Sequence, residues 1–341
     1  MKWLLDLLGI NATRPGDELE EAVERVVEGI EPRLRLVPGY RRKLLPALQK
    51  ALTHIDETVD RIPGPLELNR KAYFDDPEVK AFFASPDELD TIIHDSSEIS
   101  AFFDQVHEVP HQEALALLCV NKEEKNIFGM ELAGNDIRRE VPQTAINFYD
   151  HKLMSPAVDE DVLRCGIKKC IFDGLITYTL QRILGLKSQR RELEDQRRIL
   201  HTRLRARQAV GNSLDTLIAS ARNNAEQQIE EIESNLRLAE DRLRQLPASE
   251  HVLGAYLEEI QRIFNHPEAF IQMSVVCHRI NNMGIKVDTD STHPENTVCF
   301  SELEIAQVLK RVVSIVRFPL CSDALTRSGP GDPPIKERSL G

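Results

Sequence analysis

The sequence predicts an α+β protein with a helical N-terminal domain and a split antiparallel β domain, into which a long antiparallel coiled-coil hairpin is inserted. Three observations lead to this prediction. The first hundred residues show helical periodicity, apolar runs of strand length occur in two separate stretches, and residues 172–264 between them repeat apolar positions at steps of three and four. Neither stretch has enough strands for a sheet of its own, so we expect both to build one sheet or barrel.

A helical domain is expected over residues 1–105. Asp17 and Glu20 resemble a capping box at the start of one helix, and an apolar stripe over 42–61 predicts a second helix that stops at Pro63. Shorter helices, each of which opens on a proline and an acidic residue, are expected over 76–84 and 86–105.

The first ten residues are strongly apolar. The segment is short and lacks the small-residue cleavage site of a signal peptide, so we expect it to pack on its own domain. The alternative that stays open is a helix in a membrane interface, with Trp3 as its anchor. No stretch has the apolar length needed to span a bilayer, so we expect no other membrane contact.

The β domain is expected to combine residues 106–160 with residues 268–320. In the first part, a polar hairpin turn at 121–126 separates two apolar strands. Residues 321–341 are rich in Gly, Pro and charge, which predicts a disordered tail. The expected strands cover 114–120, 127–132, 139–148, 271–280, 284–287, 297–300 and 312–318.

The predicted hairpin and the helix after it cover residues 165–267. Reflection about Gly211 superimposes two apolar seams, so we expect the turn at Gly211 and Asn212, with Leu204 opposite Ile218. The first seam consists of Ile176, Thr179, Ile183, Leu186, Arg190, Leu193, Arg197, Leu200 and Leu204, and the second of Ile218, Arg222, Ala225, Ile229, Ile232, Leu236, Ala239, Leu243 and Leu246.

Composition narrows the classes of function. The net charge of −12 over 341 residues argues against binding to nucleic acids, which requires a positive field. The six cysteines form no CxxC pair and a chain of this length needs no disulfides, so we expect reduced cysteines and a cytoplasmic location. The sequence has no P-loop, GxGxxG or GxSxG motif, and we expect no cofactor.

Three histidines are candidate metal ligands. His107 and His111 have helical spacing, and His151 is the next histidine along the chain. Zinc binds two imidazoles and a carboxylate with an open fourth position in catalytic sites. Pro110 breaks the helix that would direct both rings to one side, so we expect loop histidines and no bound metal.

Residues 288–292 read Asp-Thr-Asp-Ser-Thr, which resembles the DxDxT motif of the haloacid-dehalogenase phosphatases. The resemblance implies that Asp288 is a nucleophile and Asp290 a general acid. It covers five residues, and the family places the motif on a parallel strand that leads into a helix. Here a further strand follows, and the alternation of strands and helices is missing, so we expect an exposed hairpin loop.

Arginines are concentrated where the predicted hairpin turns. Acidic residues of the second helix can match much of the basic charge of the first helix, but few acidic residues surround the turn. We therefore expect a cationic contact surface there, formed by Arg203, Arg205, Arg207 and Arg222.

These observations favour a non-enzymatic cytoplasmic scaffold or adaptor, in which the coiled-coil arm contacts a protein partner or a second copy of the chain as a homodimer. A two-helix arm commonly serves to reach a partner or to dimerise. The alternative is a metal-dependent hydrolase or phosphatase-like enzyme that uses the His107, His111 and His151 region or the loop of Asp288 and Asp290.

Overall fold

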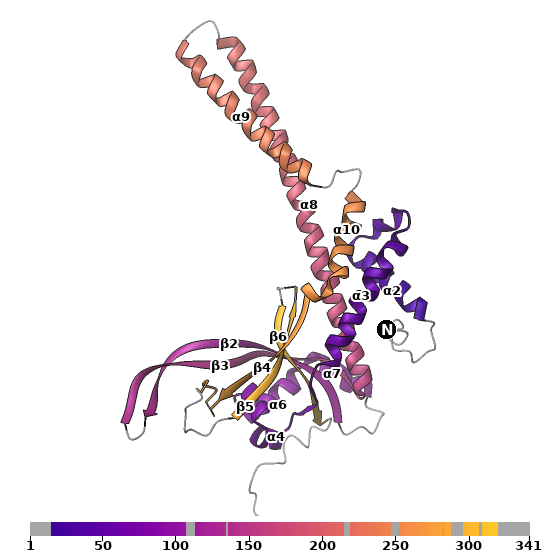
Figure 1. Cartoon of the computed structure of the whole chain (residues 1–341), viewed down its shortest axis with the longest axis vertical. Coiled ribbons are helices and arrows are strands. Elements are labelled where there is room, and N and C mark those ends of the chain that lie inside the picture. The colour runs from indigo at the N-terminus through magenta and orange to yellow at the C-terminus, as the bar shows by residue number, and fades with distance from the viewer. Residues whose placement is uncertain are drawn as a thin grey trace, which may run out of the picture. The chain divides into compact units, whose positions relative to one another are not determined.

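The computed structural model consists of helices and one β-sheet, distributed over two compact units (Figure 1), so the chain is an α+β protein. The sheet unit contains the described residues of Leu52–Asp173 and those from Pro267 onward; the helical unit contains those of Arg14–Ala51 and Gly174–His266. The structure describes residues 15–106, 113–133, 136–214, 219–246, 252–281, 283–287, 296–306 and 309–319.

The sheet combines strands from both sides of the long helical stretch, as the sequence predicts. The order of its five long strands is β3-β2-β6-β5-β4, and these strands pair antiparallel, while the two-residue β1 pairs parallel with β6. The central β2–β6 pairing runs from Glu113 opposite Pro319 to Val120 opposite Val312. The strands are β1 (Leu66–Glu67), β2 (Glu113–Ala133), β3 (Asp136–Ala157), β4 (Ile271–Ile280), β5 (Asn296–Ile305) and β6 (Leu309–Pro319).

The hairpin of β2 and β3 is longer than expected, and the predicted turn at 121–126 is wrong. These polar residues continue β2, a strand of 21 residues that pairs with the 22-residue strand β3 from Leu115 to Ala133. Their charges are matched along the strand, since Lys125 lies 2.9 Å from Glu123. Three shifts in register bend the hairpin, and at each shift β3 has a residue with positive φ, namely Glu140, Asp150 and Ser155.

A short segment joins the two outer strands of the sheet. Its Gly284 oxygen accepts a hydrogen bond from the backbone N–H of Ile146 in β3, and the N–H of Val287 donates to Arg279 O in β4. Gly284 has φ of 73°, and a Cβ there would lie 3.0 Å from Ile146 O, so the position requires glycine. The expected strand over 284–287 is therefore a pair of isolated bridges that curls the sheet toward a barrel at this end.

Four short helices cover one face of the sheet: α4 (Arg70–Asp75), α5 (Pro77–Phe82), α6 (Pro86–Asp95) and α7 (Ser97–Val106). The side chains of Asn69, Asp76 and Ser85 cap the first three by accepting backbone N–H bonds. Their apolar faces close the core of the sheet unit, which includes Tyr73, Phe82, Phe83, Leu89, Ile93 and Ile99 from the helices and Ala116, Leu118, Phe300, Val316 and Phe318 from the strands.

The helical unit is built from α2 (Pro15–Ile30), η1 (Pro32–Leu36), α9 (Ala219–Gln245), α10 (Val252–Asn265) and parts of α3 (Tyr40–Asp60) and α8 (Glu160–Leu214). No helix in the described part of the chain combines the length and the apolar character that crossing a bilayer would require. The buried apolar side chains of this unit include Val23, Val26, Leu34, Leu44, Leu48, Ile183, Leu257, Ile260 and Phe264.

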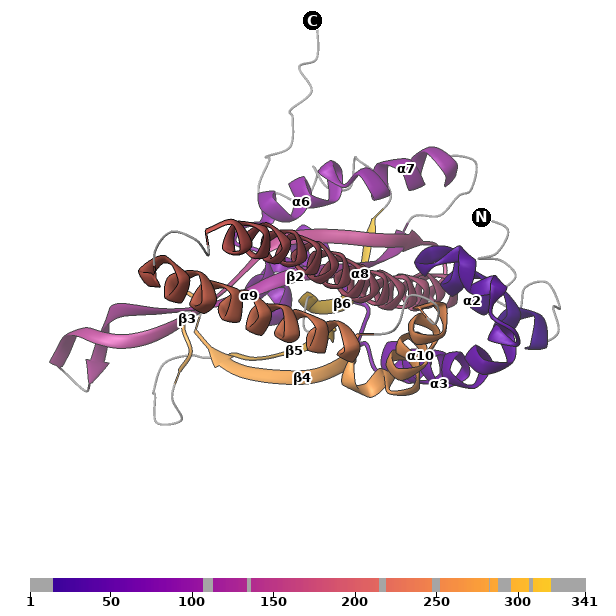
Figure 2. The same cartoon turned by 90° about the horizontal axis from the view of Figure 1, so that it is seen from above.

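The predicted turn at Gly211 and Asn212 is wrong, because α8 continues through both residues to Leu214. A glycine inside a helix costs only about 1 kcal/mol relative to alanine, which a helix of this length can absorb. The register also differs: His201 Nε2 lies 3.8 Å from Glu240 Oε1, whereas reflection about Gly211 aligns His201 with Ala221. In both views, α9 lies beside the C-terminal half of α8 (Figure 1, Figure 2).

A buried carboxylate in the helical unit makes its stability depend on pH. Glu31 is 6% exposed, and its carboxylate lies 2.8 Å from Arg33 Nε and 2.7 Å from Lys187 Nζ. The hydrogen bond from Arg33 lowers the pKa of Glu31 most, burial opposes it, and Lys187 adds to the lowering, so that the pKa falls to about 2.

The folded-state pKa lies below that of the unfolded chain, so this stabilisation is complete above about pH 4.5 and is lost as the pH falls toward 2. Between pH 6 and pH 3 the wild type should lose about 2 kcal/mol more free energy of unfolding than Glu31→Gln, measured by urea denaturation. Glu57→Gln, which removes an exposed carboxylate, controls for net charge. Equal losses in wild type and Glu31→Gln would contradict the assignment.

Candidate functional site

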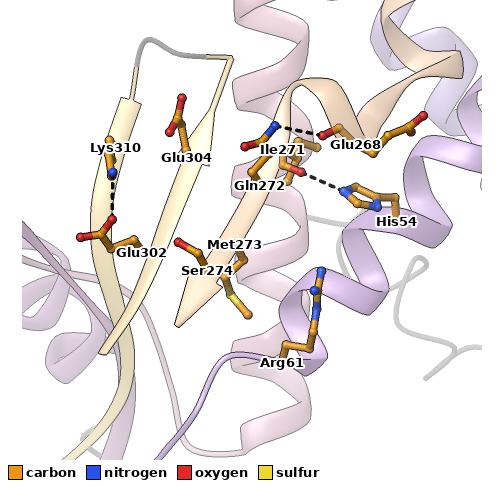
Figure 3. Close-up of a pocket in the computed structure, with 10 residues that line it drawn as sticks. All are labelled: His54, Arg61, Glu268, Ile271, Gln272, Met273, Ser274, Glu302, Glu304 and Lys310. Carbon is orange, nitrogen blue, oxygen red and sulfur yellow. Dashed lines mark hydrogen bonds and ion pairs between the residues drawn. The ribbon is translucent and has the colours of Figure 1, made fainter. Parts of the chain in front are cut away.

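A polar cleft of about 340 Å³ lies in the sheet unit, between strands β4, β5 and β6 and the end of helix α3 (Figure 3). It falls in the size range of ligand sites in proteins. Ten residues line it: His54, Arg61, Glu268, Ile271, Gln272, Met273, Ser274, Glu302, Glu304 and Lys310.

One wall of the cleft is formed by neighbouring residues of strands β4, β5 and β6. Gln272 of β4 lies opposite Glu304 of β5, which in turn lies opposite Lys310 of β6. Ser274 and Glu302 form the next row. Because residues at alternate positions of a strand share a face, these two rows form a polar surface on one side of the sheet.

Glu302 is the most deeply buried charge of this wall, with 5% of its surface exposed. Burial alone would raise the pKa of this carboxyl, but its ion pairs with Lys122 and Lys310 lower it below its ordinary value. The two ammonium groups lie 2.5 and 2.9 Å from its oxygens. Glu302 is therefore an anion that two lysines compensate, as a buried charge requires.

A second ion pair continues this network away from the cleft. Glu124 lies 2.7 Å from Lys286 and 3.7 Å from His278 Nε2. Burial, together with the charges of Lys286 and Lys122, lowers the pKa of His278 below its ordinary value. The described carboxylates of this network are thus each held in ion pairs with lysines.

The opposite wall of the cleft comes from the end of α3. His54 Nε2 lies 2.9 Å from the backbone oxygen of Ile271, at the start of β4. Arg61 follows the last turn of α3, and its Nε donates to Glu57 O at 3.1 Å. Both side chains face strand β4, which is an outer strand of the sheet (Figure 3).

Of the three histidines predicted as metal ligands, the structure describes only His151. His151 lies in β3, where its Nε2 is 2.7 Å from the backbone oxygen of Phe82 and its ring stacks on Phe83 at 5.0 Å. These contacts give it a packing role. His107 and His111 lie outside the described residues, and among those described no group of three His, Cys, Asp or Glu side chains is suited to a metal.

Asp288 and Asp290 also lie outside the described residues. Strand β4, before them in the chain, and strand β5, after them, pair antiparallel. Among the described residues on either side of this segment, the parallel strand and following helix that the phosphatase resemblance implies are not found.

The predicted cationic surface is described in part. Arg203, Arg205 and Arg207 are exposed on α8, and no carboxylate among the described residues lies within ion-pair distance of them. Arg222 lies in α9, but its side chain is outside the description.

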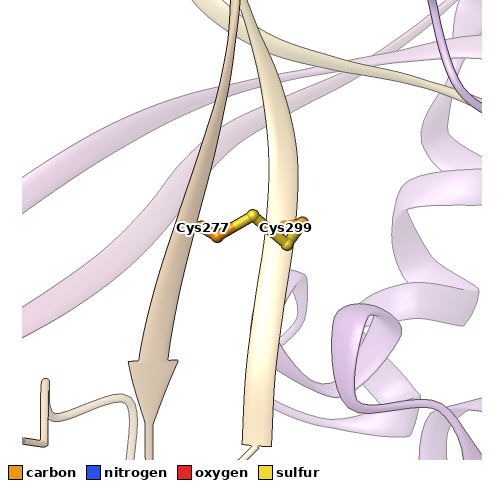
Figure 4. The surroundings of a disulfide bond; sticks show 2 residues. All are labelled: Cys277 and Cys299. Atoms are coloured by element: carbon orange, nitrogen blue, oxygen red, sulfur yellow. A yellow bond between two sulfur atoms is a disulfide. The ribbon is translucent and has the colours of Figure 1, made fainter. Parts of the chain in front are cut away.

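The expectation of reduced cysteines throughout the chain is wrong. Cys277 of β4 and Cys299 of β5 lie opposite each other and form a disulfide (Figure 4). Both residues are at least partly exposed, whereas the free thiol of Cys119 is buried and its pKa is raised to about 12. Disulfides are typical of oxidising compartments, so this bond counts against the expected cytoplasmic location.

The polar network was missed by the sequence analysis, although one signal was present. Val298, Phe300 and Glu302 occupy alternate positions of β5 and are all buried, so the third of them places a carboxylate in an otherwise apolar row. Its lysine partners come from other strands and have no spacing that a sequence could reveal.

Comparison of the chain with protein families, curated proteins and solved structures finds no match.

Proposed function

We propose that the chain is a non-enzymatic interaction protein, a scaffold or adaptor, whose arm contacts a protein partner or a second copy. The arm comprises the distal part of α8, residues 184–214, and α9, residues 219–245. In this proposal the two helices form an antiparallel coiled-coil hairpin, although not in the register that reflection about Gly211 predicts.

The observation that carries the proposal is the burial pattern of the arm. In α8, Leu193 is buried, and Leu186, Arg190, Leu200 and Leu204 are half-buried; Arg197 departs from the predicted seam, since it is exposed. In α9, Ala239 is buried, and Ile229, Ile232, Leu236 and Leu243 are half-buried. A narrow apolar seam of this kind holds two helices together and leaves the remaining surface of both to a partner.

The arginines near the end of α8 indicate the chemistry of that partner. Arg203, Arg205 and Arg207 are exposed and have no described carboxylate within ion-pair distance. Arginine forms bidentate contacts with carboxylates, and steering by charge raises association rates. An acidic protein surface fits this part of the arm.

The triple replacement of Arg203, Arg205 and Arg207 by Glu should abolish binding of the partner through the arm. Chemical crosslinking in native lysate with mass spectrometry should join wild-type residues near the end of α8 to the partner, or to a second copy, and the triple variant should lose at least nine tenths of these crosslinks.

The matched control replaces Arg237, Arg242 and Arg244, at the opposite end of α9, by Glu. These three are exposed, and the change in charge is the same. Sedimentation velocity distinguishes self-association from binding of another protein. Retention of the crosslinks in the first triple variant would refute the proposal.

The hydrolase alternative gains no support from the described residues. Of its candidate residues, His151 is described, and its ring is held by Phe82 and Phe83. We therefore propose a single function.

A further inference from the structure

The outer edge of strand β4 can be located from its existing hydrogen bonds. The backbone oxygen of Ile271 faces the His54 ring, and that of Arg279 accepts the N–H of Val287. Both bonds lie on the side of β4 away from β5. Backbone groups of a strand alternate between its two sides, so the odd-numbered residues of β4 direct theirs outward.

Cys277 supports this assignment independently. Its Cα lies 4.1 Å from that of Cys299, as in a pair that exchanges no backbone hydrogen bonds. Between Ile271 and Cys277, the backbone groups of Met273 and Val275 therefore also point outward. Neither makes a backbone hydrogen bond on that side within the described part of the chain, and the Val275 side chain is 66% exposed.

The polar cleft lies along this unpaired edge. It is lined by four successive residues of β4, from Ile271 to Ser274, and by His54 and Arg61 on the opposite wall (Figure 3). A strand edge that faces a helix across an open cleft is suited to receive an extended peptide, because the edge offers backbone partners and the cleft receives alternate side chains.

Charge indicates which side chain the cleft would accept. Glu302 is compensated by two lysines, and Arg61 is held by its own helix, with Nη2 3.4 Å from Thr58 Oγ1. Glu304 is half-buried, and no described cation forms an ion pair with it. The cleft thus contains one carboxylate that a lysine or arginine could match.

We propose that β4 binds an extended segment of another protein as an added strand, with a basic side chain of that segment directed toward Glu304. The backbone groups of Met273 and Val275 supply the pairing, and the cleft supplies selectivity. This surface is separate from the arm, so either proposal can fail alone.

The test uses random ten-residue peptides displayed on phage, selected against the full chain and then synthesised. Selected peptides should carry a Lys or Arg at one preferred position. Val275→Pro removes an outward N–H and leaves the β5 pairing intact, so it should weaken binding at least tenfold. Val275→Thr keeps the N–H and should bind as the wild type does. Glu304→Gln should weaken binding about fivefold, whereas Glu57→Gln should not.

A second measurement does not depend on the fold of any variant. Methylation of successive backbone nitrogens of a selected peptide should abolish binding to the wild-type chain at every second position, because an added strand donates only from alternate residues. A selection without binders, binders indifferent to Val275→Pro, or a methylation pattern without period two would each overturn the proposal.

Discussion

Lys122→Met should lower the free energy of unfolding by about 4 kcal/mol, because it leaves a buried carboxylate without its closest cation. Glu302 is 5% exposed, and Lys122 lies 2.5 Å from it. The second cation, Lys310, is 60% exposed, so it cannot take over the buried position of the Lys122 ammonium group beside Glu302. Urea denaturation monitored by circular dichroism measures the change.

Two further variants separate the lost charge from lost packing. Lys310→Met should cost no more than about 1 kcal/mol, since that pair is largely solvated on the lysine side. The double variant Lys122→Met/Glu302→Gln should recover most of the stability, because it removes the unpaired charge. A double variant as unstable as Lys122→Met would show that the packing of the lysine stem accounts for the loss.

Replacing Cys277 and Cys299 by Ser should lower the free energy of unfolding by about 3 kcal/mol, because the bond closes a loop between residues 22 positions apart. Because Cys277 is exposed, a serine at this position does not introduce a buried polar group. Thermal and urea unfolding under oxidising conditions measure the difference.

Reduction of the wild type should reproduce the loss, and the double serine variant should not respond to reductant. Cys170→Ser, which removes an exposed free thiol, is the control for the loss of a thiol group. Identical stabilities of wild type and double variant under oxidising conditions would contradict a stabilising bond.

The sequence predicted those features that depend on local periodicity. Strands that precede and strands that follow the long helices in the sequence form a single sheet, as predicted. Nearly all of the described seam positions of α8 and α9 are buried or half-buried. Their 3.6-residue repeat is a property of each helix alone. The exception is Arg197, whose long polar side chain reaches solvent.

The features that the sequence did not reveal depend on which parts of the chain lie next to each other in the fold. Residues 121–126 have the composition of a turn, yet β3 supplies each of them with a strand neighbour. Gly211 is a residue type that commonly ends helices, yet α8 continues through it. Likewise, neither the Cys277–Cys299 bond nor the cations around Glu302 can be identified before the register of β4, β5 and β6 is known.

The pairing of β2 with β6 also affects how the chain is made. Val120 and its partner Val312 are far apart in sequence, and at 5–20 residues per second a ribosome needs on the order of 10–40 s to pass from one to the other. During that interval the edge of β2 that later pairs with β6 has no native neighbour and can bind another nascent chain. A slower elongation rate lengthens this exposure, so the yield of native protein should rise when codons between the two strands are translated faster.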